Sequence, residues 1–204
     1  MRYERGVVGL DPVVLEGSIV RLEPLQRSHF DAMCAVGCDP ALWTLTVNNA
    51  GTQSGMRQWF DGALADAQRG SALPFATVLV ATGEVVGGTR FGNIDHKDRR
   101  AEIGWTFVAK PWQKKGVNVE AKYLMLRQAF EGWHLQRVEF KTDAINQQSR
   151  RALLAIGAVE EGTLRKHMLT WTSRTRDTVY YSVIDDDWPA VKQLLEGRLQ
   201  RGGS

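Results

Sequence analysis

The period of the hydrophobic pattern changes at Pro74. Of all the sequence features, this change restricts the possible folds of the chain most. Upstream, Met56–Arg69 repeats its apolar side chains at helical spacing. Downstream the period is two, which predicts successive strands over Phe75–Ala81, Glu84–Asp95 and Arg100–Val108. The turns between them are short, so the three strands form a meander.

A strand–helix–strand unit follows the meander. Further helices are expected from about Asn118 to Trp133, from Gln147 to Ile156 with Gly157 as C-cap, and from Pro189 to Leu199. Further strands are expected over Ser18–Leu25, Arg137–Asp143, Val159–Trp171 and Thr175–Ile184, and Ser28 is the expected N-cap of a short early helix. This order predicts a mixed α/β (α+β) fold. Since no linker interrupts it, residues 1–204 are expected to form a single domain with a core over about 14–199.

Composition excludes several functional classes. Lysine and arginine total 26 against 23 acidic residues, a net charge of +3 that is too small and scattered for a nucleic-acid partner. No apolar run is long enough to span a membrane, and Met1–Gly9 holds no hydrophobic signal region. Cys34 and Cys38 lie one helical turn apart with no second pair, so no disulfide framework is expected. Two free cysteines are typical of a protein in a reducing cytoplasm. No metal site is expected, because the histidines are dispersed: His29, His96, His134 and His167.

The segment Val108–Asn118 is the best candidate for a binding loop. It joins a strand to a long helix, so its backbone N–H groups point at one spot in front of the positive end of the helix dipole. Gly116 allows close approach, Lys114 and Lys115 add positive charge, and Asn118 is a favoured N-cap. These features suit a pyrophosphate, although a plain surface turn that caps a helix explains the same residues. The segment is neither a Walker loop nor a dinucleotide fingerprint.

Gln113-x-x-Gly116-x-Asn118 resembles the acyl-CoA pyrophosphate loop of the GNAT N-acetyltransferases, with Asn118 in place of that family's Gly or Ala. Three further pieces occur in the order of the branch that holds the Rim-type N-terminal acetyltransferases of ribosomal proteins. They are Ala101–Trp105, Asn146-x-x-Ser149 ahead of Leu154–Ala158, and Gly162-x-Leu164-Arg165. The resemblance implies the GNAT fold, with a mixed and mostly antiparallel sheet of about seven strands flanked by helices.

The resemblance also implies acetyl-CoA as co-substrate. It places pyrophosphate contacts on the loop and the following helix start, pantetheine contacts on the backbone of the Arg100–Val108 strand where this strand parts from its neighbour, and one more contact on Asn146. The implied residues are Thr106, Phe107, Val108, Gln113, Lys114, Lys115, Gly116, Val117, Asn118, Val119, Asn146 and Ser149.

Glu102 is the candidate general base. Strict alternation would place Glu102, Gly104 and Thr106 on one strand face, opposite Ile103, Trp105 and Phe107, with Gly104 leaving room beside the carboxylate. An acceptor amine must lose a proton before it attacks a thioester. The resemblance agrees, since family members hold a base glutamate at the matching position. A solvated or ion-paired glutamate is the alternative.

Ser149 is the candidate general acid for the leaving thiolate, by resemblance to some Rim-type members. As pure structure, Asn146 and Ser149 are a helix-capping pair at the N-cap and N3 positions. Tyr180 and Tyr181 are the alternative donors, or simply aromatic packing in a strand.

The resulting prediction is a cytoplasmic N-acetyltransferase that acts on a primary amine of a small molecule or a protein N-terminus, with a homodimer as a possible assembly. Two alternatives stay open. One is a CoA-binding sensor without chemistry. The other is an acyltransferase that uses a donor such as succinyl-CoA. Arg90 or Arg165 could then pair with the carboxylate of the acyl group. The acceptor pocket is expected along Leu42–Thr52 and around His167–Trp171, where Trp43 and Trp171 pack a substrate or each other.

Overall fold

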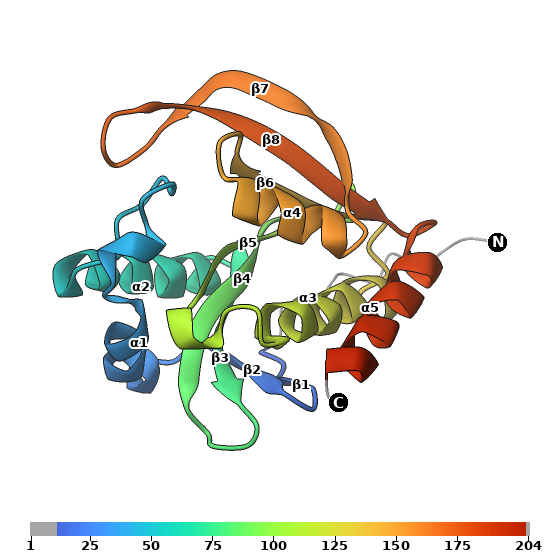
Figure 1. Cartoon of the computed structure of the whole chain (residues 1–204), viewed down its shortest axis with the longest axis horizontal. Helices are drawn as coiled ribbons and strands as arrows, with labels where there is room; N and C mark the ends of the chain where they lie inside the picture. Colours follow the sequence, from blue (N-terminus) through green and yellow to red (C-terminus); the bar gives the residue numbers. More distant parts are fainter. Residues whose placement is uncertain (1–11, 203–204) are drawn as a thin grey trace.

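A computed structural model describes residues 12–202, so the expectation for Met1–Gly9 lies outside the described residues. Its centre is an eight-stranded sheet in the order β1-β2-β3-β4-β5-β6-β8-β7 (Figure 1). The strands are β1 Leu15–Glu16, β2 Val20–Pro24, β3 Ala72–Leu79, β4 Val85–Asp95, β5 Arg100–Val108, β6 Arg137–Asp143, β7 Val159–Leu169 and β8 Thr175–Ile184. All neighbours pair antiparallel except β5 and β6, which are parallel. The mixed, mostly antiparallel sheet is therefore confirmed, and the strand beyond the expected seven is the two-residue β1.

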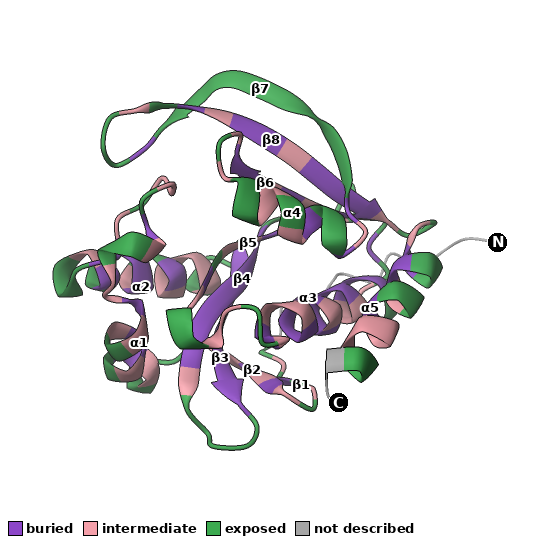
Figure 2. Ribbon diagram, viewed as in Figure 1, coloured by how far each residue is buried: buried purple, intermediate pink, exposed green. Residues whose placement is uncertain are grey.

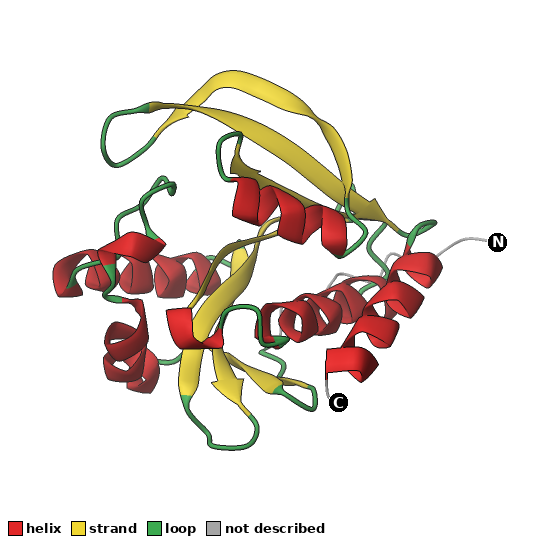
Figure 3. Ribbon diagram, viewed as in Figure 1, coloured by secondary structure: helices red, strands yellow, loops and turns green. Residues whose placement is uncertain are grey.

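Five α-helices cover the sheet (Figure 3). They are α1 Phe30–Gly37, α2 Gln53–Gln68, α3 Val117–Arg127, α4 Gln147–Ala155 and α5 Trp188–Gly202. Short 3-10 turns occupy Arg27–His29, Pro40–Leu42 and Lys110–Trp112, and a π-helical turn at Gln128–Gly132 extends α3.

Alternate residues of β3 divide between two hydrophobic cores, one on each face of the sheet. Phe75 packs into the core that α3, α4 and α5 complete, with Leu124 and Leu195 among its members. Ala76 and Val78 pack into the core of α1 and α2, with Met33 and Phe60. The two faces are called the α3 face and the α2 face below.

Two expected helix boundaries are wrong. The first helix is not capped by Ser28, because a 3-10 turn over Arg27–His29 precedes it and the backbone N–H of Gln26 donates to His29 Nδ1. The long helix begins one residue earlier than expected, with Gly116 rather than Asn118 as N-cap. The left-handed glycine expected at the end of α4 lies one residue beyond the C-cap. The helix ends at Ala155 with Ile156 as its C-cap, and Gly157 follows with a φ of 87° and donates its N–H to the Leu154 carbonyl.

The β7–β8 hairpin projects from the edge of the sheet, and every residue of β7 is exposed (Figure 2). Its tip is held to the α1–α2 connection, because Trp171 Nε1 donates to the Trp43 carbonyl at 2.8 Å. Trp43 itself is buried against Trp59 and Phe107, whereas Trp171 is 43% exposed. The two indoles therefore do not stack on each other. Within residues 12–202, no helix is both long and apolar enough to cross a membrane.

Candidate active site

The sheet opens between β5 and β6. These two strands pair only from Arg100 to Glu102 on β5 and from Arg137 to Glu139 on β6. Beyond Glu102, β5 keeps its antiparallel partner β4 while β6 pairs with β8. The far half of β5 thus has backbone groups without a strand partner on one side, as expected from the sequence, and Thr106 there is exposed.

A β-bulge reverses the side-chain alternation within β5. Trp105 has a φ of 51°, and the register moves from Arg90↔Gly104 to Gly88↔Phe107, so Thr89 faces two residues. Thr106 consequently turns its hydroxyl toward Thr89 Oγ1 (2.7 Å) and toward α3, while Phe107 packs on the α2 face. The expectation that Glu102 and Thr106 share a face is wrong, because strict alternation along the sequence does not show where a bulge adds a residue to the strand.

Glu102 lies on the α2 face and is 7% exposed. Its Oε2 accepts from Asn93 Nδ2 at 2.7 Å and pairs with Lys141 Nζ at 2.7 Å. Its Oε1 has no hydrogen-bond donor among residues 12–202 and lies 3.2 Å from where a Cβ on Gly104 would stand. Gly104 therefore leaves the expected room, and the ion-paired alternative also describes this glutamate correctly.

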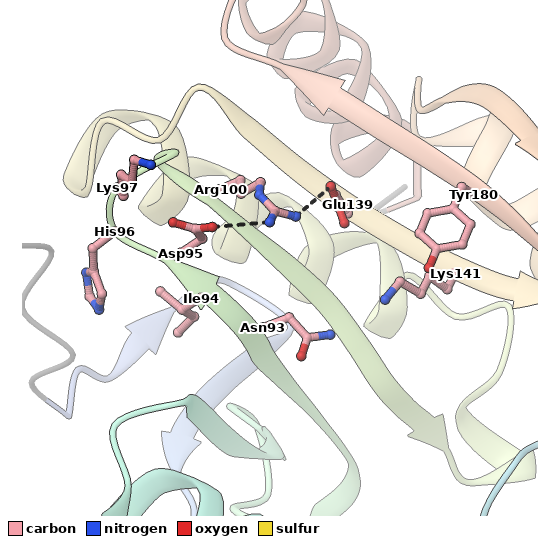
Figure 4. A pocket seen from close by; sticks show the side chains of 9 residues that line it. All are labelled: Asn93, Ile94, Asp95, His96, Lys97, Arg100, Glu139, Lys141 and Tyr180. Carbon is pink, nitrogen blue, oxygen red and sulfur yellow. Dashed lines mark hydrogen bonds and ion pairs between the residues drawn. The ribbon is translucent and has the colours of Figure 1, made fainter.

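Lys141 responds to this pairing. Burial opposes its charge, but the hydrogen bond and electrostatic attraction of Glu102, together with smaller contributions from Tyr180, outweigh burial and raise the pKa of Lys141. Asn93 and Lys141 also line an open cavity of about 790 Å³ (Figure 4). The other lining residues include Tyr180, His96 and Arg100, and Arg100 pairs with both Asp95 and Glu139. A solvent-accessible space thus adjoins Glu102 on the α2 face.

The loop at the end of β5 has the geometry of an anion cradle. Lys114 and Gly116 both have left-handed backbones, with φ of 63° and 80°, and the N-terminus of α3 follows directly. Lys114 and Lys115 are exposed, and Lys115 Nζ lies 5.0 Å from the Trp112 ring centroid. Gln113 ties the loop to β5, because its Nε2 donates to the Val108 carbonyl at 2.9 Å.

Asn118 is not the N-cap of α3, contrary to the expectation from the sequence. It lies in the first turn of α3, where its Oδ1 is buried and accepts no hydrogen bond from residues 12–202. Val117 is buried and Val119 is half-buried against the α3-face core, so these two contribute backbone to the helix start.

The α4 N-terminus faces the loop from the other side of the opening. The Asn146 side chain accepts from the Ser149 backbone N–H at 3.0 Å, which confirms the capping geometry. The Ser149 hydroxyl takes no part in the cap. Gln148 Nε2 donates to Gln113 Oε1 at 3.3 Å, so the two segments touch.

The two tyrosines have different surroundings. Tyr181 is fully buried, its hydroxyl donates to Glu160, and burial raises its pKa, so it is a packing residue. Tyr180 is half-buried on the α2 face, where it lines the cavity beside Lys141. Arg90 also reaches this face, paired with Asp66 at 3.0 Å and placed over the Trp105 ring. Arg165 lines a separate hollow formed by residues 163–167 of β7.

Sequence reasoning missed Lys122. This α3 lysine is buried, and its Nζ donates to Thr106 Oγ1 at 2.8 Å beneath the bulge. Burial lowers its pKa to about 7. A lysine among apolar helix residues was the available signal, but its partner became visible only with the fold. Among the described residues, no cluster of three or more His, Cys, Asp or Glu side chains is arranged to hold a metal ion.

The opening in the sheet, the loop and the fold together define a class of protein. Residues 20–159 match the model of the acetyltransferase (GNAT) domain, and the chain belongs to this family of acyl-CoA-dependent N-acetyltransferases. A crystal structure of a GCN5-related N-acetyltransferase from Brucella melitensis is similar with a TM-score of 0.83 and 30% identity, covering 92% of this chain and 85% of that one. The expected family and fold are confirmed.

Two further relatives lie in the Rim-like branch. Mycobacterium smegmatis RimJ, solved in complex with CoA-disulfide, is 25% identical with a TM-score of 0.76, and the match covers 92% of each chain. The "Putative ribosomal N-acetyltransferase YdaF" of Bacillus subtilis (strain 168) is 32% identical over 114 residues, which are 56% of this chain. The match spans 61% of that curated relative's length.

Proposed function

We propose that the protein transfers the acetyl group of acetyl-CoA to a primary amine by direct attack. The observation that carries this proposal is the parting of β5 from β6 directly beyond Glu102, on a strand that leads into the Lys114–Gly116 cradle. A thioester chain can run along the unpartnered edge of β5, with its phosphates at the start of α3. Acetyl-CoA supplies the activated acetyl group.

The residues of the cradle fit a pyrophosphate. Two left-handed residues and the first turn of α3 direct backbone N–H groups to one place, and Lys114 and Lys115 add charge. On this proposal Thr106, Phe107 and Val108 hold the pantetheine arm through their backbone, and Asn146 contacts the arm from α4. Because Gln113 already occupies the Val108 carbonyl, the arm would engage other backbone groups of β5 or displace this side chain.

Glu102 and Ser149 are assigned the two proton transfers. Oε2 of Glu102 is fixed by Asn93 and Lys141, so Oε1 is the atom left to take a proton from the amine, directly or through a water molecule. The Ser149 hydroxyl, which the helix cap does not use, donates to the departing thiolate. Tyr180 is the alternative donor, since its ring lines the neighbouring cavity.

The acceptor is proposed to approach from the α2 face. The cavity beside Glu102 is open to solvent there. Trp43 and Trp171 do not line this cavity; their hydrogen bond joins the hairpin tip to the α1–α2 connection. The name of the YdaF relative supports a protein N-terminus of ribosomal origin as acceptor. Cytoplasmic location and a homodimer remain predictions.

An acceptor screen tests the function. Purified protein is incubated with acetyl-CoA and a panel of amines that includes ribosomal-protein N-terminal peptides, polyamines and amino acids, and free thiol is detected. Acceptor-dependent thiol release supports an enzyme. Tight CoA binding without release over the whole panel would instead support the CoA-binding sensor, and release only with succinyl-CoA would support the other acyl donor.

A further inference from the structure

Arg176 on β8 is a buried cation that has no ion-pair partner within residues 12–202. Its side chain is 8% exposed, yet it makes no ion pair or hydrogen bond with residues 12–202. Its Nε is buried and has no hydrogen-bond partner among residues 12–202. An unpaired guanidinium in such a site is costly, because burial removes hydration and nothing replaces it. Burial accordingly lowers the pKa of Arg176.

The nearest acids are already engaged. Asp143 attracts Arg176 but is paired with Arg174, and it also accepts from the Ile145 backbone. Glu102 attracts Arg176 more weakly and is held by Lys141 and Asn93. Within residues 12–202, the two carboxylates that attract Arg176 are therefore both paired with other cations.

Arg176 lies at the open end of the sheet, on the α2 face. Paired residues of antiparallel strands share a face, and Tyr180 is opposite Lys141 while Thr178 is opposite Asp143. Arg176 follows two residues beyond Thr178, past the last residue of β6. Thr178 has a second buried and unpartnered polar atom, Oγ1, on the same face.

We infer that Arg176 binds a carboxylate of the substrate, next to the place where Glu102 meets the amine. A guanidinium donates two parallel N–H···O bonds to a carboxylate, and the Nε–H of Arg176, which has no partner among residues 12–202, is one such donor. The inference rests on the proposed function and narrows its substrate class. The carboxylate belongs either to the acceptor, adjacent to its amine, or to a dicarboxylic acyl group on the donor.

Binding measurements with matched ligand pairs test this site without requiring turnover. The donor pair is succinyl-CoA and acetyl-CoA. The acceptor pair is the C-terminally amidated dipeptides Asp-Ala-NH2 and Asn-Ala-NH2, of which only the first carries a carboxylate, titrated in the presence of CoA. We expect the wild type to prefer the carboxylate member of one pair at least tenfold, about 1.4 kcal/mol. Which pair shows the preference identifies the source of the carboxylate.

Two variants and a control complete the test. R176Q should abolish the preference, whereas R201Q removes an exposed arginine at the end of α5 and should retain it. If R176Q does not fold, R176M replaces it, because loss of an unpaired buried charge should maintain or raise the unfolding midpoint. Equal affinity within both pairs for the wild type, or an unchanged preference in the Arg176 variants, would overturn the inference. A preference without any acyl transfer would leave the subsite intact and reject only the proposed function.

Discussion

The Lys122 ammonium lies where its charge is disfavoured. It is buried under the β5 bulge with threonine hydroxyls as its hydrogen-bond partners, and its pKa falls from 10.5 to about 7. Between these two pH values the unfolded chain holds a proton that the folded chain lacks. The free energy of unfolding should therefore rise with pH in this interval, by up to about 1.4 kcal/mol per pH unit.

The Lys122→Met variant isolates this contribution. Denaturant unfolding of both proteins is measured from pH 6.5 to 9.5 (a range of about three units). The free energy of unfolding of the wild type should rise relative to that of the variant as pH increases. Below about pH 7 both states of the wild type are protonated, so the difference should level off there. Parallel profiles for the two proteins would show that the lysine titrates normally in the fold.

The structure distinguishes the two roles considered for Ser149, proton donor and helix-capping residue. Because the cap uses its backbone N–H, Ser149→Ala keeps the bond to Asn146 and should leave the unfolding midpoint unchanged. Turnover should fall by on the order of 10² at most, with CoA affinity retained. As the matched control, Asn146→Ala removes the cap and should cost about 1 kcal/mol of stability. Full turnover in Ser149→Ala would transfer the acid role to Tyr180 or water.

At the scale of elements, the loop between β5 and α3 should decide donor affinity. Gly116 has a φ of 80°, and a Cβ there would stand 2.9 Å from Ile19 Cδ1. Gly116→Asp adds this strain and a negative charge in front of the helix N-terminus, so calorimetry should show CoA affinity reduced at least tenfold, ~1.4 kcal/mol.

Gly116→Asn is the matched control for the loop, since it has the same shape without the charge. It should lose less affinity than Gly116→Asp, and the difference between the two should shrink at high salt. Wild-type affinity in a folded Gly116→Asp protein would mean that the loop is only a turn.

Local signals were enough to predict most elements and the loop, but not the contacts that cross the sheet. The end of α4 falls within one residue of the prediction, with left-handed Gly157 directly after the C-cap Ile156, since a helix end depends on neighbouring residues. The bulge at Trp105 depends on the register with β4 and was therefore missed, and with it the face of Thr106. Glu120 was missed for the same reason: its carboxylate accepts from the backbone of Ser18, Ile19 and Val20, about a hundred residues earlier.

At the scale of the whole molecule, the acyl donor and the acceptor amine are proposed to bind from opposite faces of the sheet. The cradle and α4 belong to the α3 face, whereas Glu102 and the open cavity belong to the α2 face. On the proposed function, the donor reaches Glu102 where β5 and β6 part. A change at Glu102 should therefore alter turnover without altering donor binding, because the proposed site for the donor phosphates is the loop at the far end of β5.

Turnover against pH for Glu102→Gln, with CoA affinity measured on the same sample, tests this arrangement most directly. At pH 7 turnover should fall by ~10²-fold or more, with part of the loss recovered at high pH as free amine accumulates. CoA affinity should stay at the wild-type value, and Glu84→Gln, an exposed glutamate in the β3–β4 turn, should behave as wild type. Wild-type turnover with a flat pH response in Glu102→Gln would contradict the account, as would an equal loss of CoA affinity.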